Sequence, residues 1–105
     1  MSAIGYVTRE GDSFKGQLRT LTIRAAIEIT PNPSKASDSH PDYRVSSEGI
    51  EVGAGWKRVG ETSGNEYVAL VMAAPEFGPR RIYANLGRAA GKDENSFAII
   101  WNPAD

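Results

Sequence analysis

The feature that most constrains this chain is a strict alternation of apolar and mostly polar residues over positions 21–29. Leu21, Ile23, Ala25, Ile27 and Ile29 occupy the odd positions of this segment. Successive side chains of a β-strand point to opposite faces, so a repeat of two residues is typical of a strand. The segment therefore predicts a strand with one buried face and one solvent-facing face.

A change of parity precedes this segment. Phe14, Gly16 and Leu18 fall on even positions, whereas the apolar residues that follow fall on odd positions. A period-two pattern changes parity only through a bulge or a bend. We place this bend near Arg19 and Thr20, and we expect the strand to cross a barrel corner there.

The rest of the chain consists of short apolar stretches between turn residues such as Gly11-Asp12 and Glu48-Gly49. Further strands are expected at residues 3–9, 42–46, 50–58, 66–72, 81–86 and 96–101. No segment has a convincing helical pattern. The sequence thus predicts an all-β fold, a small antiparallel barrel or sandwich of about six to eight strands with little helix. Its 105 residues are enough for one such domain, residues 1–105.

The same patterns predict which side chains form the core. In the strand at 50–58, Trp56 shares a face with Val52 and Ala54, which favours burial of Trp56 over a role on the surface. Gly53 and Gly55 share the other face, which suggests that another element packs closely there. The residues expected to be buried are Leu21, Ile23, Ile27, Ile29, Trp56, Leu70, Ile82, Leu86 and Ile100.

Composition narrows the range of functions. The net charge is −1 and there is no cysteine, which excludes disulfides, thiolate metal sites and a cysteine nucleophile. A dedicated binder of duplex DNA is usually strongly basic, so any nucleic-acid surface must be a local patch. The sequence shows neither a signal peptide nor a membrane helix, and we expect a cytoplasmic protein. So short a chain buries a modest core, which makes a homodimer a natural supplement.

The residues that could carry catalysis are few. The single histidine, His40, lies among loop-forming residues. Asp38, His40 and Asp42 stand at alternate positions, but Pro41 interrupts them and no further ligand cluster is close in sequence. We therefore predict no enzyme activity, no metal site at these three residues and no cofactor.

A binding surface is expected on the strand at 81–86. If Ile82, Ala84 and Leu86 face the core, the alternate residues Arg81, Tyr83 and Asn85 face outward together. Arginine and tyrosine are enriched at binding hot spots. The alternative is that this strand is scaffold, in which case the proline-rich and serine-rich loop at 31–41 is the candidate site.

Basic residues elsewhere extend this candidate surface. Trp56-Lys57-Arg58 and the segment from Arg80 to Tyr83 interleave aromatic and basic residues, a mixture that suits single-stranded nucleic acid. The full set of candidate binding residues is Arg81, Tyr83, Asn85, Arg19, Arg44 and Lys57. Because the net charge is close to zero, an unidentified protein partner is favoured, and single-stranded nucleic acid stays open as the alternative.

Several stretches together resemble the domain of unknown function 736 family. They are Ile4-Gly5, Gly16-Gln17-Leu18-Arg19-Thr20-Leu21-Thr22, Pro41-Asp42-Tyr43-Arg44-Val45, Gly53-Ala54-Gly55-Trp56-Lys57, Ile82-Tyr83-Ala84-Asn85-Leu86 and Ile99-Ile100-Trp101. The chain departs from the family at Gly55, where alanine is common, and at Ala74, where aspartate is common.

The resemblance covers nearly the whole chain and implies a context. The family consists of small bacterial proteins that are often carried on plasmids and conjugative elements. It has no established activity, so no residue inherits a catalytic role. The resemblance implies a bacterial, cytoplasmic accessory protein that travels with mobile DNA. In that setting the expected partner belongs to transfer, replication or host-defence machinery.

Overall fold

Eight β-strands make up the fold in the computed structural model. The model describes residues 3–33, 36–37, 39–60, 64, 66–75, 78, 81–88 and 95–102. The strands are β1 (Ala3–Glu10), β2 (Ser13–Arg19), β3 (Arg24–Pro31), β4 (Tyr43–Ser47), β5 (Ile50–Val59), β6 (Glu66–Met72), β7 (Ile82–Arg88) and β8 (Ser96–Trp101).

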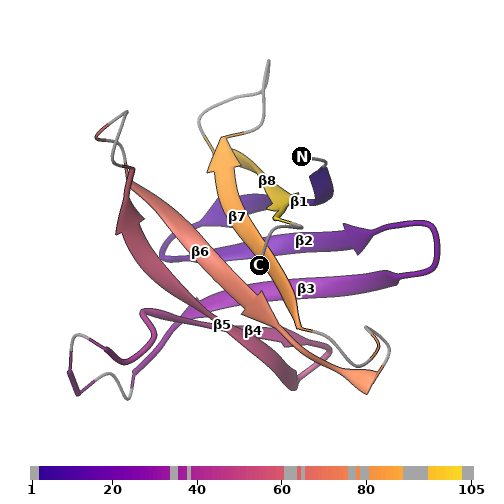
Figure 1. Cartoon of the computed structure of the whole chain (residues 1–105), viewed down its shortest axis with the longest axis horizontal. Coiled ribbons are helices and arrows are strands. Elements are labelled where there is room, and N and C mark those ends of the chain that lie inside the picture. Colours follow the sequence, from indigo (N-terminus) through magenta and orange to yellow (C-terminus); the bar gives the residue numbers. More distant parts are fainter. Residues whose placement is uncertain are drawn as a thin grey trace.

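The strands form a closed antiparallel barrel in which each one pairs with its neighbours in sequence (Figure 1). Pairing of β1 with β8 closes the barrel. The prediction of an all-β antiparallel barrel is confirmed, and the described residues contain no α-helix. None of the described segments forms a helix with the length and apolar character needed to cross a membrane.

The barrel interior is filled by side chains from all strands except β5. Three aromatic rings pack together inside it, because the Phe14 ring meets Tyr43 and Phe97 edge-on with centroid distances of 6.0 and 5.2 Å. An eight-stranded barrel is just wide enough for side chains to fill it. The buried apolar residues are Val7, Phe14, Leu18, Ile27, Ile29, Val45, Leu70, Met72, Ala84, Leu86, Ala98 and Ile99. Burial of one large aliphatic side chain of this set contributes about 1.5–3 kcal/mol to folding.

Two of the hairpins follow the expected turn chemistry. The β4–β5 turn has positive φ at both central residues, Glu48 (51°) and Gly49 (84°), as a type I′ turn requires. The β1–β2 turn places Gly11 (φ 63°) at its first central position. Both turns were predicted from the sequence and are confirmed.

The predicted bend at Arg19 and Thr20 is wrong, because the chain reverses direction there. Thr20 to Ile23 forms a tight turn between β2 and β3, with Thr20 N donating to Ile23 O at 2.8 Å. The Thr20 hydroxyl accepts from Ile23 N at 3.0 Å. Leu21, predicted to be buried, is at the tip of this turn and is fully exposed.

Of the other residues predicted to form the core, some are buried and others are not. Ile27, Ile29, Leu70 and Leu86 are buried as predicted. Ile23 and Ile82 are partly buried and pack against the core. The prediction for Ile100 is wrong by one position, because Ile99 occupies the interior of β8 and Ile100 faces outward. Trp56 also faces outward, for a reason that concerns the candidate site.

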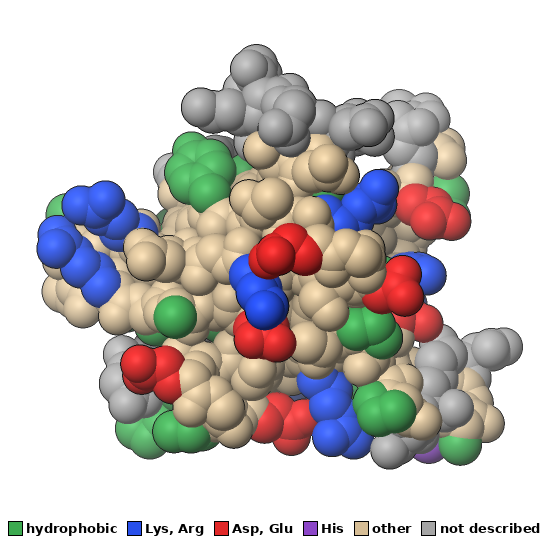
Figure 2. Space-filling model, turned by 180° about the vertical axis from the view of Figure 1, so that it is seen from behind, with side chains coloured by type: hydrophobic (Ala, Val, Ile, Leu, Met, Phe, Trp, Pro, Cys, Tyr) green, Lys and Arg blue, Asp and Glu red, His purple; other side chains and the backbone are tan. Residues whose placement is uncertain are grey.

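Charges of both signs are interspersed over the face of the barrel seen in Figure 2. One example is the outward pair Lys15 and Glu28, which stand opposite each other in β2 and β3. Opposite charges across a strand pair stabilise a sheet modestly and do not form a single-sign field. This face is typical of a solvated surface.

Candidate functional site

The outer face of strands β4 to β7 carries apolar and aromatic side chains. Arg44, Ala54, Val71 and Tyr83 stand opposite one another in successive strands and so share one side of the sheet. Directly paired residues of an antiparallel sheet lie on the same face. Because Arg44 is exposed on this side, the row faces outward.

Trp56 lies on the same outer face, one row away, because the inner face of β5 is made of glycine. Gly55 is buried opposite Leu70, and Gly53 is opposite Met72. A Cβ at Gly55 would lie 2.9 Å from Leu70 Cδ2 and 3.0 Å from Val68 Cγ1, so a larger side chain would require both neighbours to shift. The expectation of close packing on the glycine face is confirmed, whereas the burial of Trp56 in the core is wrong. The larger side chains of β5 are left outside.

The loop at 32–42 is clamped at its base over this outer face. Asn32 N donates to Asp42 O at 3.0 Å, and Asn32 Nδ2 donates to Pro41 O at 2.9 Å. Asp42 N in turn donates to Gly55 O at 2.9 Å, and the Asp42 carboxylate accepts from Lys57 N at 2.8 Å. Both ends of the loop are thereby held against β5.

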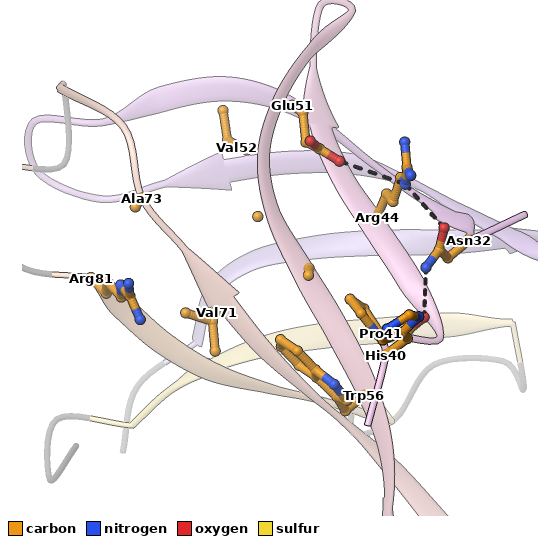
Figure 3. A pocket seen from close by; sticks show the side chains of 12 residues that line it. Asn32, His40, Pro41, Arg44, Glu51, Val52, Trp56, Val71, Ala73 and Arg81 are labelled. Atoms are coloured by element: carbon orange, nitrogen blue, oxygen red, sulfur yellow. Dashed lines mark hydrogen bonds and ion pairs between the residues drawn. The ribbon is translucent and has the colours of Figure 1, made fainter. Parts of the chain in front are cut away.

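Trp56 holds the loop at a second point. Its indole Nε1 donates to Ser39 O at 3.1 Å. Next to Ser39, the backbone N of His40 donates to Ser37 O, and His40 Nδ1 accepts from Ala36 N, both at 3.1 Å. The indole and imidazole rings are thus placed beside each other on the rim of the sheet (Figure 3).

Loop and sheet together enclose an open groove of about 580 Å³. Ala54, Val71 and Ala73 form part of its apolar lining. Figure 3 shows Trp56 and His40 at one side of the groove and Arg81 at the opposite side. The arrangement offers an apolar surface, two rings and a cation to a single bound group.

The two arginines of the groove differ in their surroundings. Arg44 Nε donates to Asn32 Oδ1 at 3.1 Å and lies 3.7 Å from Glu51 Oε1, so its charge is partly balanced. Arg81 is exposed and has no ion-pair or hydrogen-bond partner within the described part of the chain. Arg81 is therefore the cation that is free to meet an anionic group of a ligand.

The structure brings some of the predicted binding residues together and separates others. Arg44 and Arg81 line the groove. Tyr83 and Asn85 lie beside it on the outer face of β7, opposite Val71 and Ala69. The expected outward orientation of Arg81, Tyr83 and Asn85 agrees with burial of Ala84 and Leu86 on the other side.

Lys57 and Arg19 do not belong to this group. Lys57 has the interior parity of β5 but lies at an exposed end, where its Nζ is 5.9 Å from the centroid of the Tyr43 ring. Arg19 is at the far end of β2, next to the β2–β3 turn. Eight strand residues separate that turn from the clamped loop along β3, a distance of about 26 Å. Arg80, in the basic segment, is outside the described residues.

Two groove residues, Trp56 and His40, were assigned other roles from the sequence. The parity of Trp56 with Val52 and Ala54 predicts burial in the core, and the sequence places His40 among loop-forming residues without a binding role. The available signal was the pair of glycines at alternate positions of β5, since a strand face without side chains must lie against a crowded interior.

The predicted absence of a metal site at residues 38, 40 and 42 is not tested, because Asp38 lies outside the described residues. Among the residues that are described, no three His, Asp or Glu side chains come together as metal ligands would.

Comparison with known proteins gives the family alone. No curated protein and no solved structure matches the chain. A family model described as protein of unknown function (DUF736) matches residues 3–104. This match covers nearly the whole sequence and agrees with the resemblance seen in the short motifs. The chain therefore belongs to the DUF736 family of proteins of unknown function.

Proposed function

We propose that this protein is a non-enzymatic, protein-binding module, and that the groove beside Trp56 is its binding site. The observation that carries the proposal is the outward placement of Trp56 and Val71 in the same groove as Arg81, which lies across the groove from Trp56. A small domain gains stability when such side chains are buried, so an apolar outer face of this kind suits a partner. Tyrosine, tryptophan and arginine are also the residue types enriched at binding hot spots.

The chemistry of the groove defines the segment of the partner that fits it. An apolar side chain would cover Val71 and Ala54, while a carboxylate nearby would pair with Arg81. Because Arg44 already interacts with Asn32 and Glu51, it would line the groove without attracting a second carboxylate strongly. The proposed ligand is a protein segment that carries an apolar residue next to an acidic one.

The family context suggests where such a partner would be found. A bacterial accessory protein that travels with mobile DNA would meet transfer, replication or host-defence machinery in the cytoplasm. The absence of cysteine from the sequence fits that reducing compartment.

A second candidate function is the binding of single-stranded nucleic acid. Bases stack on aromatic rings while cations hold phosphates, and the groove combines Trp56 and His40 with Arg44 and Arg81. The partial neutralisation of Arg44 and the apolar lining favour a protein instead.

The test is an affinity capture from the native host with the full chain as bait, in parallel samples with and without nuclease. We expect the same protein in both samples, and we expect Arg81→Ala and Ala73→Trp to reduce its recovery at least about tenfold, a loss of roughly 1.4 kcal/mol. Lys15→Ala is the matched control, because it removes a cation from a different face.

The outcomes separate the candidates. Recovery that disappears after nuclease treatment would favour nucleic acid. Equal recovery by the Arg81→Ala, Ala73→Trp and Lys15→Ala variants would remove the groove as the binding site.

A further inference from the structure

Half of strand β3 has an open edge. β2 pairs with β3 from Arg24 to Ile29, whereas β4 pairs only with the segment from Glu28 to Pro31. Within the described part of the chain, no strand pairs with residues 24–27 on the side away from β2. As a result, the β2–β3 hairpin projects from the barrel at the right of Figure 1.

The phase of the ladder determines which backbone groups face this edge. Thr20 N donates to Ile23 O, and hydrogen-bonded pairs alternate along an antiparallel ladder. Ala25 and Ile27 therefore bond to β2, while the N–H and C=O groups of Arg24 and Ala26 point the other way. At the other end of β3, Asn32 N donates to Asp42 O, so the backbone groups of the even-numbered residues point away from β2 there as well. Arg24 and Ala26 thus present a short, unpaired strand edge.

An apolar cleft of about 630 Å³ runs along this edge. Residues 22–26 of the hairpin form one wall, and the β4–β5 turn with Ile50 and Val52 forms the other. Pro75, after β6, also lines the cleft. Ile50 is 69% exposed, so the cleft presents apolar surface to solvent.

The hairpin tip has the properties of a group that would fill such a cleft. Leu21 is the most exposed large apolar side chain of the described residues, at 102%. It lies at the end of the same β3 edge but does not line its own cleft. A hairpin that carries both an apolar tip and an apolar cleft is complementary to itself.

The charges of the hairpin and the cleft are also complementary. Arg19 and Arg24 stand opposite each other in β2 and β3, and like charges in that position are destabilising. Neither has an ion-pair partner among the described residues. The rim of the cleft carries Glu48 and Glu51. In Figure 2, blue side chains gather where the hairpin projects at the left, with red and green side chains below it.

We propose that two copies of this chain associate through their β3 edges to form an antiparallel, two-fold symmetric dimer. Arg24 of each copy pairs with Ala26 of the other, which joins all the outward-facing backbone groups of these residues. Ala25 meets Ala25 of the second copy on the axis, where a small side chain permits close approach. Beyond this short ladder the edge of β3 is covered by β4, so the hairpin tip of each copy leaves the plane of the sheet there. Leu21 then enters the cleft of the other copy, and the arginines of the hairpin approach Glu48 and Glu51.

Symmetry favours a second copy over an unrelated strand as the occupant. A two-fold axis places the hairpin tip of each copy at the cleft of the other and joins the two strand edges, so one surface patch supplies both sides of the interface. Natural proteins also cover or block exposed strand edges, because such edges otherwise recruit other chains. The cleft shares Glu51, Val52 and Ala73 with the groove beside Trp56, whereas the tip residue Leu21 and the edge residues 24–26 lie outside that groove. The proposed dimer does not depend on the function proposed for the groove.

Sedimentation velocity of the full chain over a range of concentrations tests the proposal. We expect a wild-type dimer at concentrations of about 10–100 μM, and we expect Leu21→Asp to raise its dissociation constant at least about a hundredfold. Val59→Asp is the matched control, because Val59 is 62% exposed on β5, away from this edge. Arg81→Ala should leave the dimer unchanged.

Two further measurements identify the interface. Arg24→Glu should weaken the dimer about tenfold or more, and adding Glu48→Arg should restore most of that loss. The Ala26 amide should exchange with solvent more slowly in the wild-type dimer than in the Leu21→Asp monomer.

Each of the opposite results overturns the proposal. A wild-type chain that stays monomeric up to about 1 mM has no such dimer. A dimer that tolerates Leu21→Asp, or that leaves the Ala26 amide unprotected, uses another surface. An unrelated peptide strand that protects Ala26 in a monomeric chain would show a different occupant.

Discussion

The indole nitrogen of Trp56 donates a hydrogen bond to the carbonyl oxygen of Ser39, 3.1 Å away, and so ties the loop at 32–42 to the outer face of β5. The two residues are separated by 17 positions in sequence, and the rest of the loop base is held by Asn32 and Asp42. The part of the groove wall around Ser39 and His40 is therefore tied to β5 through the indole donor.

Replacing Trp56 with phenylalanine should loosen that wall. The variant keeps an aromatic ring but loses the donor, and we expect a loss of about 0.5–1.5 kcal/mol in unfolding free energy. Hydrogen exchange at the backbone amide of His40 should become faster. Trp101→Phe, the same change at the exposed end of β8, should leave this exchange rate unchanged. If the two variants behave alike, the bond to Ser39 does not hold the loop.

Truncation of Ile27 should show how much a buried core side chain contributes to the free energy of unfolding. Ile27 is 3% exposed and faces the barrel core, so Ile27→Ala should reduce the free energy of unfolding by about 2–5 kcal/mol in urea titrations. Val59→Ala, at a solvent-facing position, should cost less than about 1 kcal/mol. A loss below about half a kcal/mol for Ile27→Ala would place this face of β3 in solvent.

Adding a methyl group at Gly16 should destabilise the barrel. A Cβ there would lie 2.7 Å from Val7 Cα and 2.8 Å from the carbonyl carbon of Tyr6, both of them backbone atoms. We expect Gly16→Ala to lower the unfolding free energy by about 1–3 kcal/mol or more, measured by thermal denaturation. At Gly87 a Cβ would meet only Ile100 Cδ1 at 3.6 Å, so Gly87→Ala should be close to neutral. Equal effects at the two positions would contradict the close approach of β1 and β2.

The β2–β3 turn should depend on one hydroxyl group. Thr20 Oγ1 accepts hydrogen bonds from Ile23 N at 3.0 Å and from Thr22 N at 3.4 Å. Thr20→Ala should therefore cost about 0.5–1.5 kcal/mol, and Thr20→Ser should restore most of it. Thr22→Ala serves as the control, since only the backbone of Thr22 takes part. A serine variant as weak as the alanine variant would mean that the methyl group matters and the hydroxyl does not.

The sequence predicted the strands well because turn residues separate most of them. The exception is the turn from Thr20 to Ile23, which contains no glycine, proline, asparagine or aspartate. Its side-chain acceptor replaces the usual turn chemistry, and the alternation of Leu21 with Ile23 continues across it by chance. For that reason one bent strand was expected where the chain forms a hairpin.

The candidate site was only partly predictable, because alternation defines two faces of a strand without saying which is inside. For β7, the contrast between Leu86 and Arg81, which directly precedes the strand, identified the inner face correctly. In β5 the choice was between Trp56 and Gly55, and hydrophobicity favoured Trp56. The interior instead takes the glycine face, because Leu70 and Val68 already fill the space beside it. This crowding comes from side chains of the neighbouring strand β6, so the sequence of β5 alone does not predict which of its faces is buried.

The closure of the barrel between β1 and β8 sets the order in which the chain can assemble. Every other strand pair joins neighbours in sequence, whereas Ala3 stands opposite Ile100. Local hairpins form at little cost in loop entropy, but this one seam must bring together nearly the two ends of the chain. The seam is thus the step that separates an open sheet from a barrel, and partial unfolding should begin there.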